Sequence, residues 1–109
     1  MTVKSFAQTV GLSAQCLPAP EKEVLGAYVG DLLSWVMGKA NTQDAWITIM
    51  SNSNVVAVGS LCDLACIILA EGVTLDSATL ALAEAKGINV LLSDKSTYET
   101  AILVSGVLK

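Results

Sequence analysis

The sequence predicts a three-layer α/β fold, with a mainly parallel sheet of about four strands and helices on its flanks. Short runs rich in Val, Ile and Leu alternate with apolar segments of helical length, and turn residues separate them. One run, ACIILA at Ala65–Ala70, is continuously apolar, which is typical of a strand buried on both faces of a parallel sheet. Regular alternation of strands and helices indicates such a sheet with right-handed crossovers. A length of 109 residues suits one domain, 1–109.

The first twenty residues add an N-terminal helix and a candidate edge strand. Four apolar residues recur at helical spacing, and Gly11 can end the helix that they define. These residues are Val3, Phe6, Ala7 and Val10. Ser13–Leu17 has the length of a short edge strand, and Pro18 and Pro20 then form a connector that cannot continue a hydrogen-bonded ladder.

The next strand and helix lie in the stretch EVLGAYVGDLLSWVMG. Strand Val24–Val29 leads through Gly30 and Asp31 into the apolar helix Leu32–Met37. Asp31 is in the position of an N-cap, and Gly38 follows the last helical residue, where a helix often ends.

The middle of the chain contains a strand, a helix and a second strand. Ala45–Met50 is rich in β-forming residues and is bounded by turns, so it is predicted to be a strand. The following apolar run suits a strand or a helix by periodicity alone. We predict a helix at Asn54–Cys62, because two parallel strands need a crossover between them. Ala65–Ala70 is the next strand.

The last third of the chain has clear helix signals. Asp76 is an N-cap candidate, and Gly87 ends the helix that follows. The apolar stripe predicted for this helix is Leu75, Ala78, Leu82 and Ala85. After a strand at Ile88–Leu92, Ser96 and Glu99 form a capping box for a final helix.

Composition excludes several classes of function. The chain has no histidine, so a Ser-His-Asp or Cys-His enzyme cannot be assembled. It has no P-loop, GxGxxG or GxSxG motif, and we therefore expect a protein that is not an enzyme. All six basic residues are lysines and the net charge is −4, which argues against nucleic acid binding.

The three cysteines are predicted to be reduced and mostly buried. Cys62 and Cys66 form a C-x-x-x-C pair, and with Cys16 they could complete a metal site only with ligands of another type. No metal is therefore expected, and the sequence identifies no cofactor. The role of the three thiols stays open.

The proportion of apolar residues, 53%, exceeds what a small domain needs for its own core. Every apolar run is broken within about ten residues, which is too short to span a membrane. The N-terminus lacks the continuous apolar centre of a signal peptide, so a cytoplasmic location is expected. We expect the surplus apolar surface to lie in a subunit interface, and hence a homodimer.

Candidate binding residues follow two of the predicted strands. In open parallel sheets ligands bind beyond the carboxyl ends of the strands. Turns at Gly30-Asp31, 51–54, 71–72 and 93–96 qualify, and the first two carry the most suitable groups. The predicted contacts are Gly30, Asp31, Ser51, Asn52 and Asn54. The alternative is that the Asp and Asn residues only cap helices.

Each of the two tryptophans could have a binding role or a structural role. Trp35 and Trp46 could stack on a base, but packing in the core or in an interface is the more common role of tryptophan.

Three separated blocks resemble a DRTGG domain. They are YVGDLLSWVMG at 28–38, AWITIMSNSNVVAV at 45–58 and LACIILAEG at 64–72. The eponymous segment differs, because Lys22 stands for its arginine, Leu25 for its threonine and Ala27 for its second glycine. The side chains with which that arginine and threonine could contact a ligand in other members are therefore absent here.

The resemblance implies an α/β regulatory module. Such domains occur alone in bacteria or attached to CBS domains, and they are similar to the N-terminal domain of HPr kinase/phosphorylase. The kinase activity is not implied, because the P-loop is missing. The expected function is a non-enzymatic, homodimeric module that senses a nucleotide or small metabolite. The alternative is an adaptor for a redox (hydrogenase-type) or kinase partner, with no small ligand.

Overall fold

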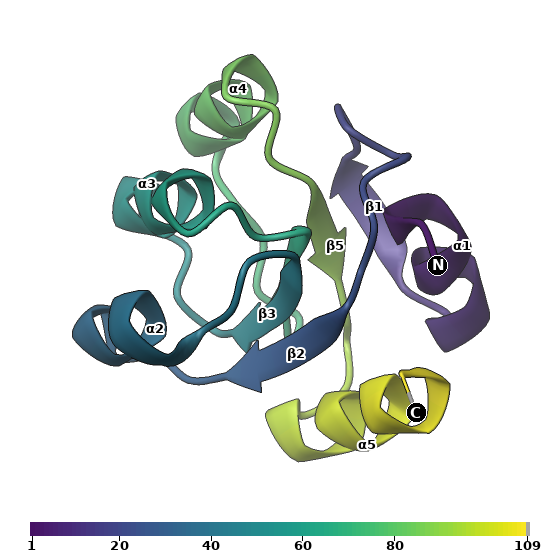
Figure 1. The fold of residues 1–109 in the computed structure, drawn as a ribbon. Coiled ribbons are helices and arrows are strands. Elements are labelled where there is room, and N and C mark those ends of the chain that lie inside the picture. Colours follow the sequence, from purple (N-terminus) through teal and green to yellow (C-terminus); the bar gives the residue numbers. More distant parts are fainter. Residues whose placement is uncertain (109) are drawn as a thin grey trace.

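A computed structural model describes residues 1–108 and shows a five-stranded sheet between two layers of helices (Figure 1). The elements in chain order are α1 (Val3–Val10), β1 (Ser13–Cys16), β2 (Gly26–Val29), α2 (Leu33–Lys39), β3 (Asp44–Thr48), α3 (Ser53–Leu61), β4 (Cys66–Leu69), α4 (Ser77–Ala85), β5 (Val90–Leu92) and α5 (Thr97–Val107). The strand order is β1-β5-β4-β3-β2. Strands β2 to β5 are parallel, and β1 is antiparallel to β5. The predicted fold class and the candidate edge strand are confirmed.

Helices α2, α3 and α4 cover one face of the sheet, and α1 and α5 cover the other (Figure 1). Side chains alternate between the two faces along each strand. Ala45 and Ile47 of β3 accordingly belong to the core cluster that includes Phe6 of α1 and Val104 of α5. Trp46, between them, belongs to the cluster under α2, α3 and α4. The sheet thus has a hydrophobic core on each side.

The parallel strands follow one another across the sheet in chain order, and their crossover helices all lie on one face. A doubly wound fold forms its ligand crevice at the point where the strand order reverses. In this sheet the strand order does not reverse between β2 and β5. The departure from chain order is β1, which pairs with β5 at the far edge. This pairing brings the start of β1 to the carboxyl end of β5, because Ser13 is opposite Leu92.

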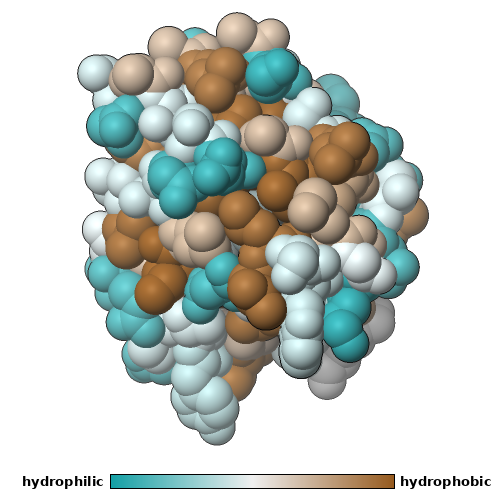
Figure 2. Space-filling view, turned by 90° about the vertical axis from the view of Figure 1, so that its left-hand side faces the viewer, coloured by the Kyte–Doolittle hydropathy of each residue, from teal (hydrophilic) through white to brown (hydrophobic). Residues whose placement is uncertain are grey.

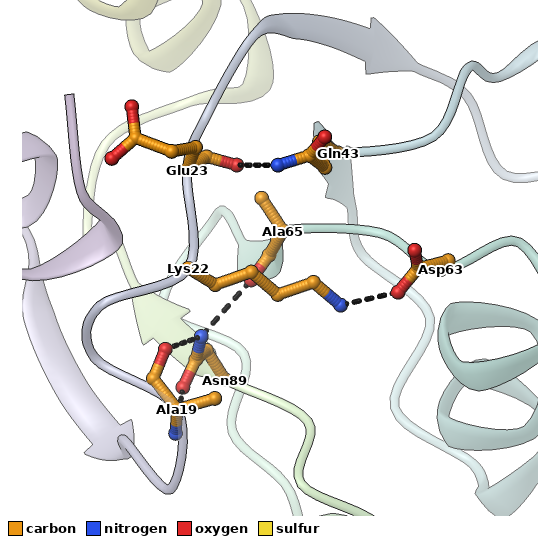
Figure 3. Close-up of polar contacts among 7 residues, drawn as sticks. All are labelled: Ala19, Lys22, Glu23, Gln43, Asp63, Ala65 and Asn89. Carbon is orange, nitrogen blue, oxygen red and sulfur yellow. Dashed lines mark hydrogen bonds and ion pairs between the residues drawn. The ribbon is translucent and has the colours of Figure 1, made fainter.

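The linker between β1 and β2 crosses the amino ends of the strands (Figure 3). The Asn89 amide holds it there, donating to the carbonyl oxygens of Ala19 and Ala65 and accepting from the Ala19 N–H. Further along the linker, Lys22 Nζ lies 2.6 Å from Asp63 Oδ1. The DRTGG-like segment, which includes Lys22, Leu25 and Ala27, runs from this linker into β2 and so begins at the amino edge of the sheet.

Three details of the first strand–helix unit differ from the prediction. Asp31 does not cap α2, since Leu32 holds the N-cap position and makes no side-chain cap hydrogen bond. Gly38 lies inside α2 and does not follow it, because the helix continues to Lys39. Strand β2 begins at Gly26, since the N–H of Val24 donates to the carbonyl of Met1.

The buried stripe of α4 also differs from the prediction. Thr79 and Ala83 face the core, whereas Ala78 and Ala85 are exposed. The helix is therefore turned so that residues four apart, beginning at the buried Leu75, contact the sheet. Within residues 1–108, no helix has both the length and the apolar character needed to cross a bilayer.

Candidate functional site

The carboxyl ends of the parallel strands meet at one edge of the sheet, and the turns considered from the sequence lie on it. The β2–α2 and β3–α3 turns are tied together by Asp31. Its Oδ1 accepts hydrogen bonds from the Thr48 hydroxyl at 2.7 Å and from the Ile49 N–H at 3.1 Å. The buried Trp46 donates from Nε1 to the carbonyl of Gly30 at 2.8 Å. These contacts fix the end of β2 against the end of β3.

Asn52 is the N-cap of α3, and its Oδ1 accepts a hydrogen bond from the Asn54 N–H at 3.0 Å. The structure therefore brings Gly30, Asp31, Ser51, Asn52 and Asn54 to one edge. It also engages Oδ1 of Asp31 and Oδ1 of Asn52 in contacts within the protein, as the capping alternative expects for Asn52.

A cavity of about 410 Å³ lies further along the same edge. It is bounded by the α1–β1 turn, the β4–α4 turn, the β5–α5 turn and one side of α5. Its lining residues are Val10, Gly11, Leu12, Ser13, Gly72, Val73, Thr74, Leu92, Ser93, Asp94, Lys95 and Leu103. None of the five predicted contact residues is among them. The β4–α4 and β5–α5 turns were expected at this edge, whereas the α1–β1 turn reaches it through the antiparallel pairing of β1.

The two turns that follow β4 and β5 are hydrogen-bonded to each other. The Glu71 N–H donates to the carbonyl of Lys95 at 2.8 Å, and the Gly72 N–H donates to that of Ser93 at 3.0 Å. Both Glu71 and Gly72 adopt left-handed backbone conformations, with φ values of 62° and 73°. This conformation is unfavourable for a residue other than glycine. The two hydrogen bonds between the turns therefore help to hold Glu71 in it.

Side chains of the β5–α5 turn are also fixed. The buried Ser93 hydroxyl lies 2.8 Å from the Thr100 hydroxyl and accepts a hydrogen bond from the Lys95 N–H. Ser96 and Glu99 form the capping box predicted for α5. The Glu71 carboxylate accepts from the Thr97 N–H at 2.9 Å. Two carboxylates therefore already occupy the N-terminus of α5.

Asp94 and Lys95 supply the charged side chains of the cavity wall, and both are exposed. Among residues 1–108 the ion pairs are those of Lys22 with Asp63 and of the N-terminus with Glu23, so neither Asp94 nor Lys95 is paired within that part. Both groups are free to meet a ligand.

The thiols are not placed for catalysis. Cys16 and Cys66 are buried and Cys62 is half-buried, and all three are free. Burial raises the pKa of all three thiols, that of Cys66 to about 12, and the charge of Glu84 adds to the rise in the pKa of Cys16. The thiols are therefore protonated near neutral pH and are poor nucleophiles. No cluster of three or more potential metal ligands occurs within residues 1–108.

An exposed apolar surface lies at the other end of the molecule, where β2 forms the sheet edge. We call it the α2 surface, and it consists of Leu32, Trp35 and Met37, which are 48% to 57% exposed. Figure 2 shows the side of the molecule on which α2, α3 and α4 lie, with hydrophobic side chains gathered among polar ones. Strand β2 pairs only with β3, so its outer edge carries no strand within the described chain.

Comparisons with known proteins agree with this architecture. The family model described as DRTGG domain matches residues 21–107. A solved structure, that of the CBS and DRTGG domains of the regulatory region of Clostridium perfringens pyrophosphatase complexed with the activator diadenosine tetraphosphate, superposes with a TM-score of 0.70 at 16% sequence identity. The match covers 94% of this chain and 45% of the other, so the chain spans less than half of that structure. No curated protein matches the sequence.

Proposed function

Because this chain belongs to the DRTGG domain family, we propose that it is a non-enzymatic regulatory module that senses a nucleotide or similar small metabolite. The observation that carries the proposal is the cavity at the carboxyl ends of β4 and β5. Its volume of about 410 Å³ lies in the usual range for small-molecule sites. It combines aliphatic walls with a few polar groups, which is the common composition of such sites.

Two further observations support a regulatory role without catalysis. The structurally similar pyrophosphatase region is regulatory and was solved with a dinucleotide activator, which makes nucleotides the first ligands to test. In this chain the thiols have raised pKa values, and histidine is absent from the sequence. Neither a cysteine thiolate nor a histidine base is therefore available to the cavity. The expected similarity to the HPr kinase/phosphorylase N-terminal domain stays a prediction.

We place the ligand in the cavity and keep the five sequence-predicted residues as a second location on the same edge. The Ser51 hydroxyl and the Asn52 amide nitrogen would serve there, together with Gly30, Asp31 and Asn54. Bulky substitutions at exposed residues separate the two locations. Thr74→Trp fills the cavity, whereas Asn54→Trp obstructs the second location.

Thermal denaturation with adenosine, AMP, ADP, ATP and diadenosine tetraphosphate tests the proposal. A ligand at ten times its Kd stabilises the protein by about 1.4 kcal/mol. For a domain of this size that corresponds to a rise in Tm of roughly 5 °C or more. We expect Thr74→Trp to abolish the rise and Asn54→Trp to preserve it. The opposite result would place the ligand at the second location, and no rise with any compound would refute the ligand-sensing function.

We also propose that the protein is a homodimer that associates through the α2 surface. This surface adjoins the free edge of β2, so a second copy could extend the sheet while covering the apolar side chains. Sedimentation at micromolar concentration should show a dimer that Trp35→Glu dissociates. Tyr98→Glu, at an exposed aromatic residue on the opposite face, is the matched control. A monomeric wild-type protein would contradict the dimer.

The adaptor function remains the alternative, because the α2 surface could equally receive a redox or kinase partner. A polar-lined cavity is not expected of a pure adaptor, and for this reason we favour ligand sensing. A monomeric protein that responds to no compound in the panel would favour the adaptor.

A further inference from the structure

Negative charge exceeds positive charge around the cavity. Asp94 lies in its wall, and Glu71 and Glu99 lie in the adjoining turn and in the first turn of α5. Lys95 is the cation of the cavity wall. The three carboxylates and one ammonium give a local net charge of −2. An anion brought to this cavity meets repulsion from all three carboxylates and attraction from one group.

The N-terminus of α5 cannot compensate for this charge. Helix N-termini attract phosphate because their backbone N–H groups are unpaired. Here the Thr97 N–H donates to Glu71, the Glu99 N–H donates to Ser96, and the Glu99 carboxylate accepts from the Ser96 N–H. The protein's own carboxylates thus fill the position that a phosphate would take.

Lys95 is the one basic side chain among the residues that line the cavity. Arginine, whose guanidinium binds phosphate through two hydrogen bonds, is absent from the chain. Lys22 lies at the amino edge of the sheet, where it is paired with Asp63. A nucleoside polyphosphate would enter the cavity with its charge largely uncompensated.

We infer that the cavity takes an uncharged, hydroxyl-bearing ring compound of the nucleoside class and discriminates against nucleoside polyphosphates. This inference rests on the proposed ligand-sensing function and names the ligand class of the same site. The aliphatic side chains of Val10, Leu12, Val73 and Leu103 offer a surface for a flat base. The Asp94 carboxylate is suited to accept hydrogen bonds from ribose hydroxyls, as acidic residues do in dinucleotide-binding folds.

Isothermal titration calorimetry of the full chain with adenosine, guanosine, AMP, ADP and diadenosine tetraphosphate tests the order of affinity. We expect a nucleoside to bind most tightly and each added phosphate to weaken binding, with a difference of roughly tenfold between nucleoside and diphosphate. If polyphosphates bind more tightly than nucleosides, the inference is overturned while the ligand-sensing function stands. If none of the compounds binds, both are overturned.

Two charge-reversal variants test whether the charge of the cavity wall causes the order of affinity. Asp94→Lys removes a carboxylate from the wall and adds a cation, so it should shift the AMP-to-adenosine affinity ratio toward AMP by about tenfold. Glu21→Lys makes the same change in net charge at an exposed residue of the amino edge and should leave the ratio unchanged. An equal shift in both variants, or none in Asp94→Lys, would overturn the assignment to the cavity.

Discussion

Asp44 is a buried carboxylate at the start of β3, and it determines which residue can begin β2. Its Oδ2 accepts a hydrogen bond from the Asn41 N–H at 2.8 Å. Its Oδ1 lies against the backbone of Gly26, where an added Cβ would approach it to 2.7 Å. The first glycine of the DRTGG-like segment is therefore required by packing. Ala27, at the position of the second glycine, is exposed and has room for its methyl group.

Two glycine substitutions test this residue-scale argument. Gly26→Ala should destabilise the protein by about 1–3 kcal/mol, because the methyl group overpacks a buried contact. Gly38→Ala is the matched control, since its Cβ would meet no atom within 4 Å and the position is helical. That variant should be stabilised by about 0.5–1 kcal/mol. Urea unfolding measures both, and equal stabilities of the two variants would contradict the argument.

Among the elements, the β1–β2 linker is held by the Asn89 side chain and by backbone hydrogen bonds with the start of the chain. Asn89 is buried and makes three hydrogen bonds across the amino ends of the strands, two to Ala19 and one to Ala65. The Lys22–Asp63 pair on the same linker is partly exposed to solvent. The amide should therefore contribute far more stability than the ion pair.

Substitution of each group by alanine tests this ranking. Asn89→Ala leaves buried polar groups of the linker and of β4 without partners and should cost about 2–4 kcal/mol. Lys22→Ala removes a solvent-screened ion pair and should cost less than about 1 kcal/mol. Chemical denaturation gives both values. A larger loss for Lys22→Ala would show that the ion pair, and not the amide, holds the linker.

Helix α4 offers a pH-dependent test of a capping residue. The Asp76 carboxylate accepts from the Thr79 N–H at 2.7 Å. This hydrogen bond, with a smaller contribution from the Thr79 side chain, lowers the pKa of Asp76 in the folded protein. A lowered folded-state pKa gives stability that is complete above the unfolded-state pKa and is lost as the pH falls through the folded-state value.

We therefore expect the unfolding free energy of wild type to fall more steeply below about pH 4 than that of Asp76→Asn. Asparagine keeps the cap but cannot titrate. Asp76→Ala loses the cap and should be less stable than wild type at neutral pH. Unfolding measured from pH 7 to pH 2 distinguishes the three proteins, and parallel curves for wild type and Asp76→Asn would contradict the assignment.

At the scale of the whole molecule, the fold is a sheet with a hydrophobic core on each side. Strand β4 lies at its centre, and all four of its residues are buried. Cys66 and Ile68 pack on one face, and Ile67 and Leu69 pack on the other. Access of solvent to Cys66 therefore requires the separation of a helix layer from the sheet.

Thiol labelling with iodoacetamide tests whether Cys66 becomes accessible only when a helix layer separates from the sheet. Burial raises the pKa of Cys66 to about 12, so its reactive thiolate is scarce and shielded in the native state. At pH 8 we expect Cys62, which is half-buried, to be modified first. Cys66 should react only at the rate of global unfolding. Mass spectrometry gives the order, and a Cys66 that reacts as fast as Cys62 in native buffer would contradict the two-core description.

The candidate site could be predicted only in part. The sequence indicates the edge of the sheet at which the cavity lies, because strand direction follows from the alternation of elements. It does not indicate the cavity, whose wall includes Gly11 and Ser13 from a segment sixty residues away from Gly72. The hydrogen bonds of Asp31 to Thr48 and Ile49 are likewise invisible to a local capping rule, since they connect two different turns.

The sequence alone determined the fold class, the order of the elements and the caps of α4 and α5. These features depend on periodicity and on hydrogen bonds between residues three or fewer positions apart. The tertiary structure alone decided that β1 pairs with β5, that α4 turns Thr79 and Ala83 inward, and that Glu71 occupies the N-terminus of α5. Each of these depends on contacts between distant segments, and such contacts leave no local pattern in the chain.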